Sequence, residues 1–313
     1  MRRSTVLTGL IMLGLLCMLS LTVLQSMEQP IIILRMCTGG CGLGNQMFIY
    51  ASGLGIALKY PNTIMCITGL NETSNQLHPK SALIMNVELI SNRLESCTSL
   101  PGFWWMLEHR WSSILGLTTR FEPPHTKYTP FLFNSQRTAV IEANLESFKY
   151  FKHVPHPMFR LKQYDQAKAW LTVRNITSVV HVRRGDKFQP GHSVAPLEYY
   201  EQSLQMLGPG PIAVCTDDPG WVKQQLIFRN ASVSIDHDPG FDMALLAAAS
   251  DTVVIGVGTF AWWGAYMSKA RRKLFYPVQY TLGETDKYSE RDFIPYHQPG
   301  QGEWIPVHVQ TRI

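Results

Sequence analysis

Two adjacent arginines follow an apolar stretch in the segment HVRRGDK, residues 181–187. A strand that ends in positive charge is costly to bury unless an anion lies against it. Because side chains alternate along a strand, His181 and Arg183 should share the face that meets the ligand. The fixed fork of donors on arginine suits a diphosphate. Arg184 should point the other way, where an ion pair with Asp186 or another carboxylate explains it equally well. A purely structural ion-pair network is the alternative for the whole motif.

Two glycine-containing segments offer backbone N–H groups to the same kind of ligand. Gly258-Thr259-Phe260 stands where a helix should begin, and a helix N-terminus carries unpaired N–H groups and a positive dipole end. Taken alone, Thr259 is better explained as an ordinary N-cap. The second segment is GLGNQ at residues 42–46, where glycines allow close approach of a ligand and Asn45 opens a helix. Its spacing differs from G-x-G-x-x-G, so a dinucleotide site is not indicated.

Two acidic segments are candidates for bridging Mg²⁺ or Mn²⁺ to a diphosphate. They are Asp236-His237-Asp238 and Asp217-Asp218. Both adjoin a Pro-Gly dipeptide, so turn formation is the favoured explanation. Since arginines and helix dipoles would already neutralise a diphosphate, we expect no metal and no other cofactor.

The phosphate-binding candidates share a position in the predicted fold. From about residue 173 onward, short apolar runs alternate with helical patterns, which predicts a parallel doubly wound sheet. Four polar segments each follow a predicted strand and precede a predicted helix: RRGD at 183–186, TDD at 216–218, DHD at 236–238 and GTF at 258–260. All of them should therefore lie at the carboxyl edge of one sheet, where such folds bind ligands.

The N-terminal half of the chain is less regular. Strand patterns at 31–36 and 64–68 enclose a helical pattern at 45–59, which predicts a β-α-β opening. Residues 37–44, between the first strand pattern and the helical pattern, contain four glycines and should form a loop. Further along, the tryptophan-rich FWWMLEHRW at 103–111 is best interpreted as a packed helix.

The chain begins with a membrane-like segment. Eighteen residues from Val6 to Val23 carry no charge, and as a helix they would span about 27 Å. Arg2 and Arg3 should keep the N-terminus in the cytoplasm. A cleaved signal peptide is disfavoured because Gln25-Ser26-Met27 is a poor cleavage site. We expect a cytoplasmic tail at 1–5, a transmembrane signal anchor at 6–24, a short stem at 25–30 and a luminal folded part.

Other sequence features agree with a luminal location of the folded part. Glycosylation sequons occur at Asn71, Asn175 and Asn230. Five cysteines follow the anchor, so at least one thiol is unpaired or paired elsewhere, and the pairing is open; they are Cys37, Cys41, Cys66, Cys97 and Cys215. The net charge of +5 is spread along the chain, which does not indicate a nucleic-acid partner.

The motifs together resemble a known family, the α-1,2-fucosyltransferases of glycosyltransferase family 11. The segments that carry the resemblance are GLGNQMFIYA at 42–51, HVRRGDK at 181–187 and FDMALLAAASDTVVIGVGTFAWWGAYMS at 241–268. They come in the family's order and span roughly residues 31–280. Lys149-Tyr150-Phe151 is similar to a fourth family segment, in which this chain has Glu146 where the family usually has glutamine.

The resemblance implies a GT-B-like α/β fold of two Rossmann-type doubly wound domains behind the transmembrane helix. The domains would cover residues 31–165, on the acceptor side, and 166–313, which would bind GDP-fucose. It also implies a single-pass type II protein of the Golgi membrane. The donor-binding residues that it implies are Gly44, Asn45, Gln46, His181, Arg183, Arg184, Asp242, Thr259 and Phe260.

The implied reaction is metal-independent transfer of L-fucose, with inversion, from GDP-β-L-fucose to the 2-hydroxyl of a terminal β-galactoside on a glycan. Arg183 would stabilise charge on the departing GDP. Asp186 is the candidate general base, although it is equally explained as a residue that orients an arginine, and a reaction with little base assistance stays open. The alternatives are a fucosyltransferase with a protein or core-glycan acceptor, and an inactive luminal nucleotide-binding protein.

Overall fold

The computed structural model describes residues 30–37, 41–69, 82–91, 93–97, 118–124, 127–133, 138–155, 157–185, 194–234, 238–268, 273–278, 290–295 and 302–309. The expected membrane anchor at 6–24 and the expected helix at 103–111 lie outside these ranges. Within them, every helix is too short or too polar to cross a bilayer.

The N-terminal domain is built on a parallel sheet with the strand order β4-β2-β1-β6-β5. Its strands are β1 (Ile31–Arg35), β2 (Ile64–Thr68), β4 (Glu95–Ser96), β5 (Thr118–Phe121) and β6 (Thr138–Ile141). Helix α2 (Leu43–Lys59) joins β1 to β2 and confirms the predicted β-α-β opening. The helix begins two residues earlier than expected, because the backbone at Gly42 is extended and occupies the N-cap position.

The C-terminal domain contains a second parallel sheet, with the order β10-β9-β8-β11-β12-β13. Its strands are β8 (Ser178–Val182), β9 (Ile212–Thr216), β10 (Ser232–Val233), β11 (Thr252–Val254), β12 (Lys273–Pro277) and β13 (Glu303–Val307). Its helices are α6 (Tyr164–Val173), α7 (Leu197–Leu207), α8 (Pro219–Gln224), α9 (Pro239–Ala248) and α10 (Thr259–Tyr266). This confirms the predicted doubly wound sheet.

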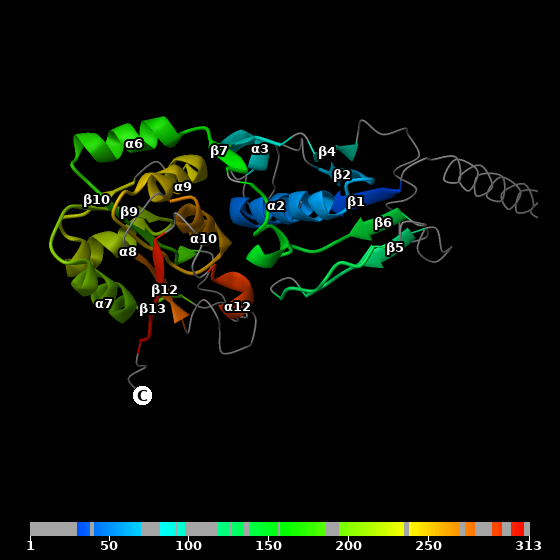
Figure 1. The fold of residues 1–313 in the computed structure, drawn as a ribbon. Coiled ribbons are helices and arrows are strands. Elements are labelled where there is room, and N and C mark those ends of the chain that lie inside the picture. The colour runs from blue at the N-terminus through cyan, green and yellow to red at the C-terminus, as the bar shows by residue number, and fades with distance from the viewer. Residues whose placement is uncertain are drawn as a thin grey trace, which may run out of the picture.

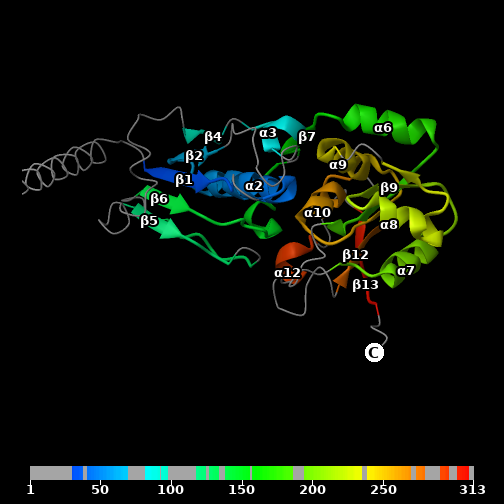
Figure 2. The same ribbon diagram turned by 180° about the vertical axis from the view of Figure 1, so that it is seen from behind.

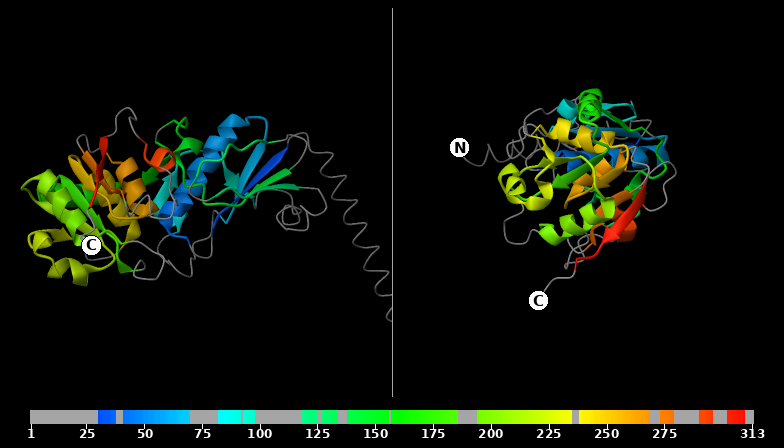
Figure 3. Two further views of the ribbon diagram at one scale, coloured as in Figure 1. Left: turned by 90° about the horizontal axis from the view of Figure 1, so that it is seen from below. Right: turned by 90° about the vertical axis from the view of Figure 1, so that its left-hand side faces the viewer.

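Shorter elements link the two sheets. Helix α3 (Leu83–Asn86) leads into strand β3 (Val87–Leu89), which pairs antiparallel with β7 (Phe159–Leu161). A 3-10 turn, η2 (Phe148–Tyr150), lies beside α2, and helix α12 (Glu290–Phe293) lies near it. Figures 1 and 2 show the two α/β domains side by side, with α2 reaching toward α10, and Figure 3 shows the same arrangement from below and from one end.

Aromatic side chains join the domains into one hydrophobic core. Phe48 of α2 lies 4.6 Å from Trp262 and 5.1 Å from Trp263 of α10, measured between ring centroids. Phe151, just after η2, stacks on Trp263 at 5.4 Å, and Phe293 of α12 lies 5.8 Å from Trp262. All five side chains are fully buried. The position of α2 relative to α10 is therefore set by packing as tight as that inside either domain.

Two disulfide bonds and one thiol account for the five cysteines. Cys37 is bonded to Cys41, and Cys66 to Cys97, while Cys215 is a buried free cysteine. Burial, reinforced by the nearby Asp242, raises the pKa of the Cys215 thiol. The thiol is therefore protonated at neutral pH and behaves as a small apolar side chain.

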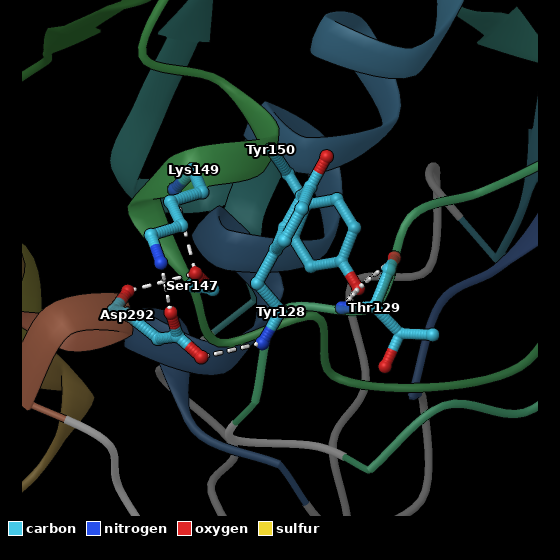
Figure 4. A network of polar contacts seen from close by, with 6 residues as sticks. All are labelled: Tyr128, Thr129, Ser147, Lys149, Tyr150 and Asp292. Atoms are coloured by element: carbon cyan, nitrogen blue, oxygen red, sulfur yellow. Dashed lines mark hydrogen bonds and ion pairs between the residues drawn. The ribbon is translucent and has the colours of Figure 1, made fainter.

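Helix α12 ties the chain's C-terminal region to both domains. The Asp292 carboxylate accepts hydrogen bonds from Lys149 Nζ and, at 2.9 Å, from the Tyr128 backbone N–H, as Figure 4 shows. The Asp292 carbonyl accepts a 2.7 Å bond from the Ser147 hydroxyl. The next carbonyl, that of Phe293, accepts the indole N–H of Trp262 in α10 at 2.7 Å. One short helix thus contacts the N-terminal domain with one residue and the C-terminal domain with the next.

We expect Asp292→Ala to lower the free energy of unfolding by about 1 to 3 kcal/mol, because it leaves a partly buried ammonium and an N–H without their acceptor. Glu88→Ala is the matched control, since Glu88 pairs with Arg160 on the surface, where both side chains are more than half exposed. That variant should lose less than about 0.5 kcal/mol. Equilibrium urea unfolding measures both, and equal losses would contradict the importance of the Asp292 contacts.

Candidate active site

Strand β8 carries the predicted arginines to the carboxyl edge of the second sheet, and its two faces differ as expected. Val179 packs into the core shared with α9 and α10, whereas Val180 and Val182 pack into a separate core against α7 and α8. His181 and Arg183 continue the first face. The His181 ring, which is buried, lies 5.5 Å from the ring of Phe260 in α10.

Arg183 lies against the start of helix α10. A methyl group built on Gly258 would come within 2.8 Å of Arg183 Nη1, so the guanidinium would have to shift to admit a larger residue. Gly258 also has a φ of +109°, a conformation that side chains rarely adopt. The structure thus brings together four predicted residues from the end of β8 and the start of α10: His181, Arg183, Thr259 and Phe260.

Arg184 belongs to the opposite face. Its guanidinium lies 4.0 Å above the Trp221 ring, and its Nε is 3.6 Å from Asp218 Oδ2. Its backbone N–H donates a 2.7 Å hydrogen bond to Asp217. Of the two roles left open by the sequence, the geometry supports an ion pair, with Asp218 as the carboxylate. The predicted contact of Arg184 with the donor stays a prediction.

The helices at this sheet edge differ in how their N-termini are satisfied. Asp218 caps α8 by accepting from the Trp221 N–H at 3.0 Å, and Asp238 caps α9 by accepting from the Gly240 N–H at 2.9 Å. These contacts agree with the favoured turn interpretation of both aspartates. No side chain caps α10, in which Gly258 takes the N-cap position and Thr259 is the first helical residue. Its first-turn N–H groups therefore remain suited to a ligand.

The N-terminus of α2 meets that of α10. A methyl group built on Gly44 would lie 2.5 Å from the Phe260 nitrogen, so the two backbones are in direct contact. The Asn45 side-chain oxygen accepts a hydrogen bond from the Thr259 hydroxyl. Helix α2 also lacks a side-chain cap. Two positive dipole ends this close repel each other unless an anion lies beside them, so the junction favours a negatively charged ligand.

The other predicted site residues occupy different positions. Both ends of the buried Gln46 amide bond to backbone groups, the carbonyl of Cys41 at 3.1 Å and the N–H of Leu83 at 2.8 Å, so Gln46 holds the loop before α2. Asp242 is buried in the first turn of α9. Asp186 lies outside the described residues.

The predicted glycosylation and metal properties are only partly covered by the structure. The Asn175 and Asn230 side chains are exposed, and Asn71 lies outside the described residues. In the described part of the chain, no cluster of three or more His, Cys, Asp or Glu side chains could hold a metal ion. Independence from metal stays a prediction.

Sequence reasoning left several contacts around the junction unassigned. Gly258 lies against Arg183, Asp218 and Trp221 lie against Arg184, and the Phe293 carbonyl accepts the indole N–H of Trp262 in α10. The sequence holds a signal for the position of Asp218, because an aspartate directly before a proline is typical of a helix N-cap. The contact between Asn45 and Thr259 joins residues 214 positions apart and left no local signal.

Two parallel sheets whose carboxyl edges meet through the first turns of α2 and α10 define a two-domain α/β fold with its candidate site between the domains. A solved structure that resembles this chain is that of the alpha-1,6-fucosyltransferase NodZ from Bradyrhizobium, in crystals soaked with GDP-fucose. The TM-score is 0.50 at 14% sequence identity, over 77% of this chain and 94% of NodZ. This likeness supports the predicted two-domain α/β fold.

Sequence comparison bears out the resemblance predicted from the motifs. Residues 161–293 match Glycosyl transferase family 11, the family that the motifs resemble. The chain is 28% identical over 287 residues to a galactoside 2-alpha-L-fucosyltransferase of Caenorhabditis elegans, covering 81% of this chain and 75% of that protein. It is also 24% identical over 111 residues to the O-antigen biosynthesis glycosyltransferase WbnK of Escherichia coli, covering 31% of this chain and 36% of WbnK.

We expect Gly44→Ala to destabilise the junction by about 1 to 3 kcal/mol, because the new methyl group meets rigid backbone of α10. Gly42→Ala is the matched control in the same segment, since a methyl group there has no neighbour within 4 Å. Its cost should be about 1 kcal/mol or less, from the changed N-cap alone. Thermal unfolding of both variants measures the two costs, and equal losses would contradict the contact between α2 and α10.

Proposed function

We propose that the chain is an inverting fucosyltransferase that moves L-fucose from GDP-β-L-fucose to the 2-hydroxyl of a terminal β-galactoside, without a metal ion. The observation that carries the proposal is the pair of uncapped helix N-termini that meet beside Arg183. The donor is supported by the motif resemblance and by the GDP-fucose soaked into NodZ crystals. The acceptor is supported by the name of the Caenorhabditis elegans relative.

In the proposed reaction, the bond between fucose C1 and the β-phosphate oxygen breaks, and its electron pair stays on that oxygen. A bond forms between C1 and the galactose 2-oxygen, whose proton passes to a base or to water. Negative charge therefore grows on the departing GDP. Arg183 and the first-turn N–H groups of α10 are fixed in place before the reaction, so they stabilise that charge without reorganisation.

Asp242 and Asp186 complete the proposed assignment. A carboxylate buried in the first turn of α9 has the chemistry to accept two N–H groups of a guanine base, which gives Asp242 the role of nucleotide selection. Asp186 remains the candidate base for the acceptor hydroxyl. The proposed setting is the Golgi lumen, with residues 6–24 as the anchor. The exposed Asn175 and Asn230 are compatible with glycosylation there.

A transfer assay with the full-length chain tests the proposal. We expect labelled GDP-fucose and a β-galactoside to give an α-1,2-linked product in the presence of EDTA. Hydrolysis of GDP-fucose without transfer would support the assignment of the donor and contradict the assignment of the acceptor. A requirement for added metal would overturn metal independence, and a chain that binds no GDP would overturn the whole assignment.

The two arginines should respond differently to the same substitution. Arg183→Gln should weaken GDP binding by about ten- to hundredfold, because it removes a charged donor from the diphosphate. Arg184→Gln should instead lower the free energy of unfolding by about 1 to 2 kcal/mol, because it removes the stacking on Trp221 and the pairing with Asp218. Calorimetric titration with GDP and thermal unfolding of both variants separate these effects. The reverse pattern would show that the faces are wrongly assigned.

A further inference from the structure

The contact between Asn45 and Thr259 limits what the threonine can do. A threonine hydroxyl has one proton to donate, and here it is donated to the side-chain oxygen of Asn45. A diphosphate offers only acceptors at neutral pH, so it needs donors from the protein. With its proton already committed, the Thr259 hydroxyl has none left for the phosphate.

The same contact determines which end of the Asn45 amide is available. In the arrangement that the structure shows, Oδ1 faces the Thr259 hydroxyl and accepts its proton. The Nδ2 group, with two N–H donors, is the end left for a ligand. The contact with Thr259 uses Oδ1, and Nδ2 has no hydrogen-bond acceptor among the described residues. The Asn45 side chain is only partly buried. Asn45 also stands in the uncapped first turn of α2, where negative charge is favoured.

We propose that Thr259 is a positioning residue, which holds the Asn45 amide so that Nδ2 donates to the leaving diphosphate. This inference rests on the proposed function and assigns a part of donor recognition to the N-terminal domain. A donor that is held in place before the reaction gains strength as charge collects on the β-phosphate oxygen. Thr259 then acts through Asn45, whereas its backbone N–H remains part of the α10 terminus.

A double-mutant cycle on the full-length chain tests this assignment, with GDP affinity measured by calorimetry. Asn45→Ala removes the donor, and Thr259→Val removes the hydroxyl while keeping the shape of the side chain. We expect each variant to bind GDP about tenfold more weakly, and the double variant to be no weaker than Asn45→Ala alone. Thr259→Ser should restore most of the affinity lost in Thr259→Val. Thr172→Val is the matched control, because the Thr172 hydroxyl bonds to a helix carbonyl on the surface of α6.

Asn45→Asp provides a second test that does not depend on the valine variant folding. An aspartate still accepts the Thr259 hydroxyl, but it presents a negative oxygen where the amide presented N–H groups. We expect GDP binding at least tenfold weaker than in Asn45→Ala, while the thermal unfolding midpoint without ligand changes little.

The outcomes separate this inference from the function on which it rests. The wild-type chain could bind GDP while the two single losses of affinity multiply to about a hundredfold in the double variant. That result would show that Thr259 and Asn45 contact the phosphate independently, and it would overturn this inference but not the proposed function. Equal GDP affinity of Asn45→Asp and Asn45→Ala would also overturn it. A wild-type chain that binds no GDP would overturn both.

Discussion

The first turns of α2 and α10 lie in contact, with the backbone of Gly44 against that of Phe260. Each turn carries the positive end of a helix dipole, so the contact is unfavourable until an anion arrives. The protein keeps the turns together by burying aromatic rings one turn further along both helices, where Phe48 meets Trp262. The packing of these rings therefore offsets the repulsion between the two positive helix ends, and a bound diphosphate would remove that repulsion.

The same sheet edge shows how a ligand site is distinguished from its surroundings. Helices α8 and α9 begin at aspartates that accept from their first-turn N–H groups, and Asp218 also pairs with Arg184. The junction beside Arg183 instead combines two helix ends that lack a side-chain cap with a nearby cation. Selectivity for one position along the edge therefore comes as much from the capping of neighbouring helices as from the groups at the site itself.

Local sequence patterns predicted the β-α-β opening, the parallel sheet of the second domain, the segments that carry the site and the opposite orientations of Arg183 and Arg184. These follow from periodicity and from turn chemistry, which act over a few residues. The pairing of Asn45 with Thr259 and the contacts of Asp292 depend on tertiary packing, and a helix of four residues such as α12 has no periodicity to detect. The choice of disulfide partners was open for the same reason, because five cysteines allow several pairings and only the fold selects among them.

The shared aromatic core has a consequence for how such chains can be inherited. Phe48 and Phe151 come from the N-terminal domain, and Trp262 and Trp263 from the other, yet they fill one interior. A recombination event that exchanged only the C-terminal domain would pair mismatched rings and open cavities at the joint. Such a chimera would keep its packing only if α2 and the segment after η2 were exchanged together with that domain. The boundary for a viable exchange therefore lies inside the N-terminal domain and not at the linker between the two sheets.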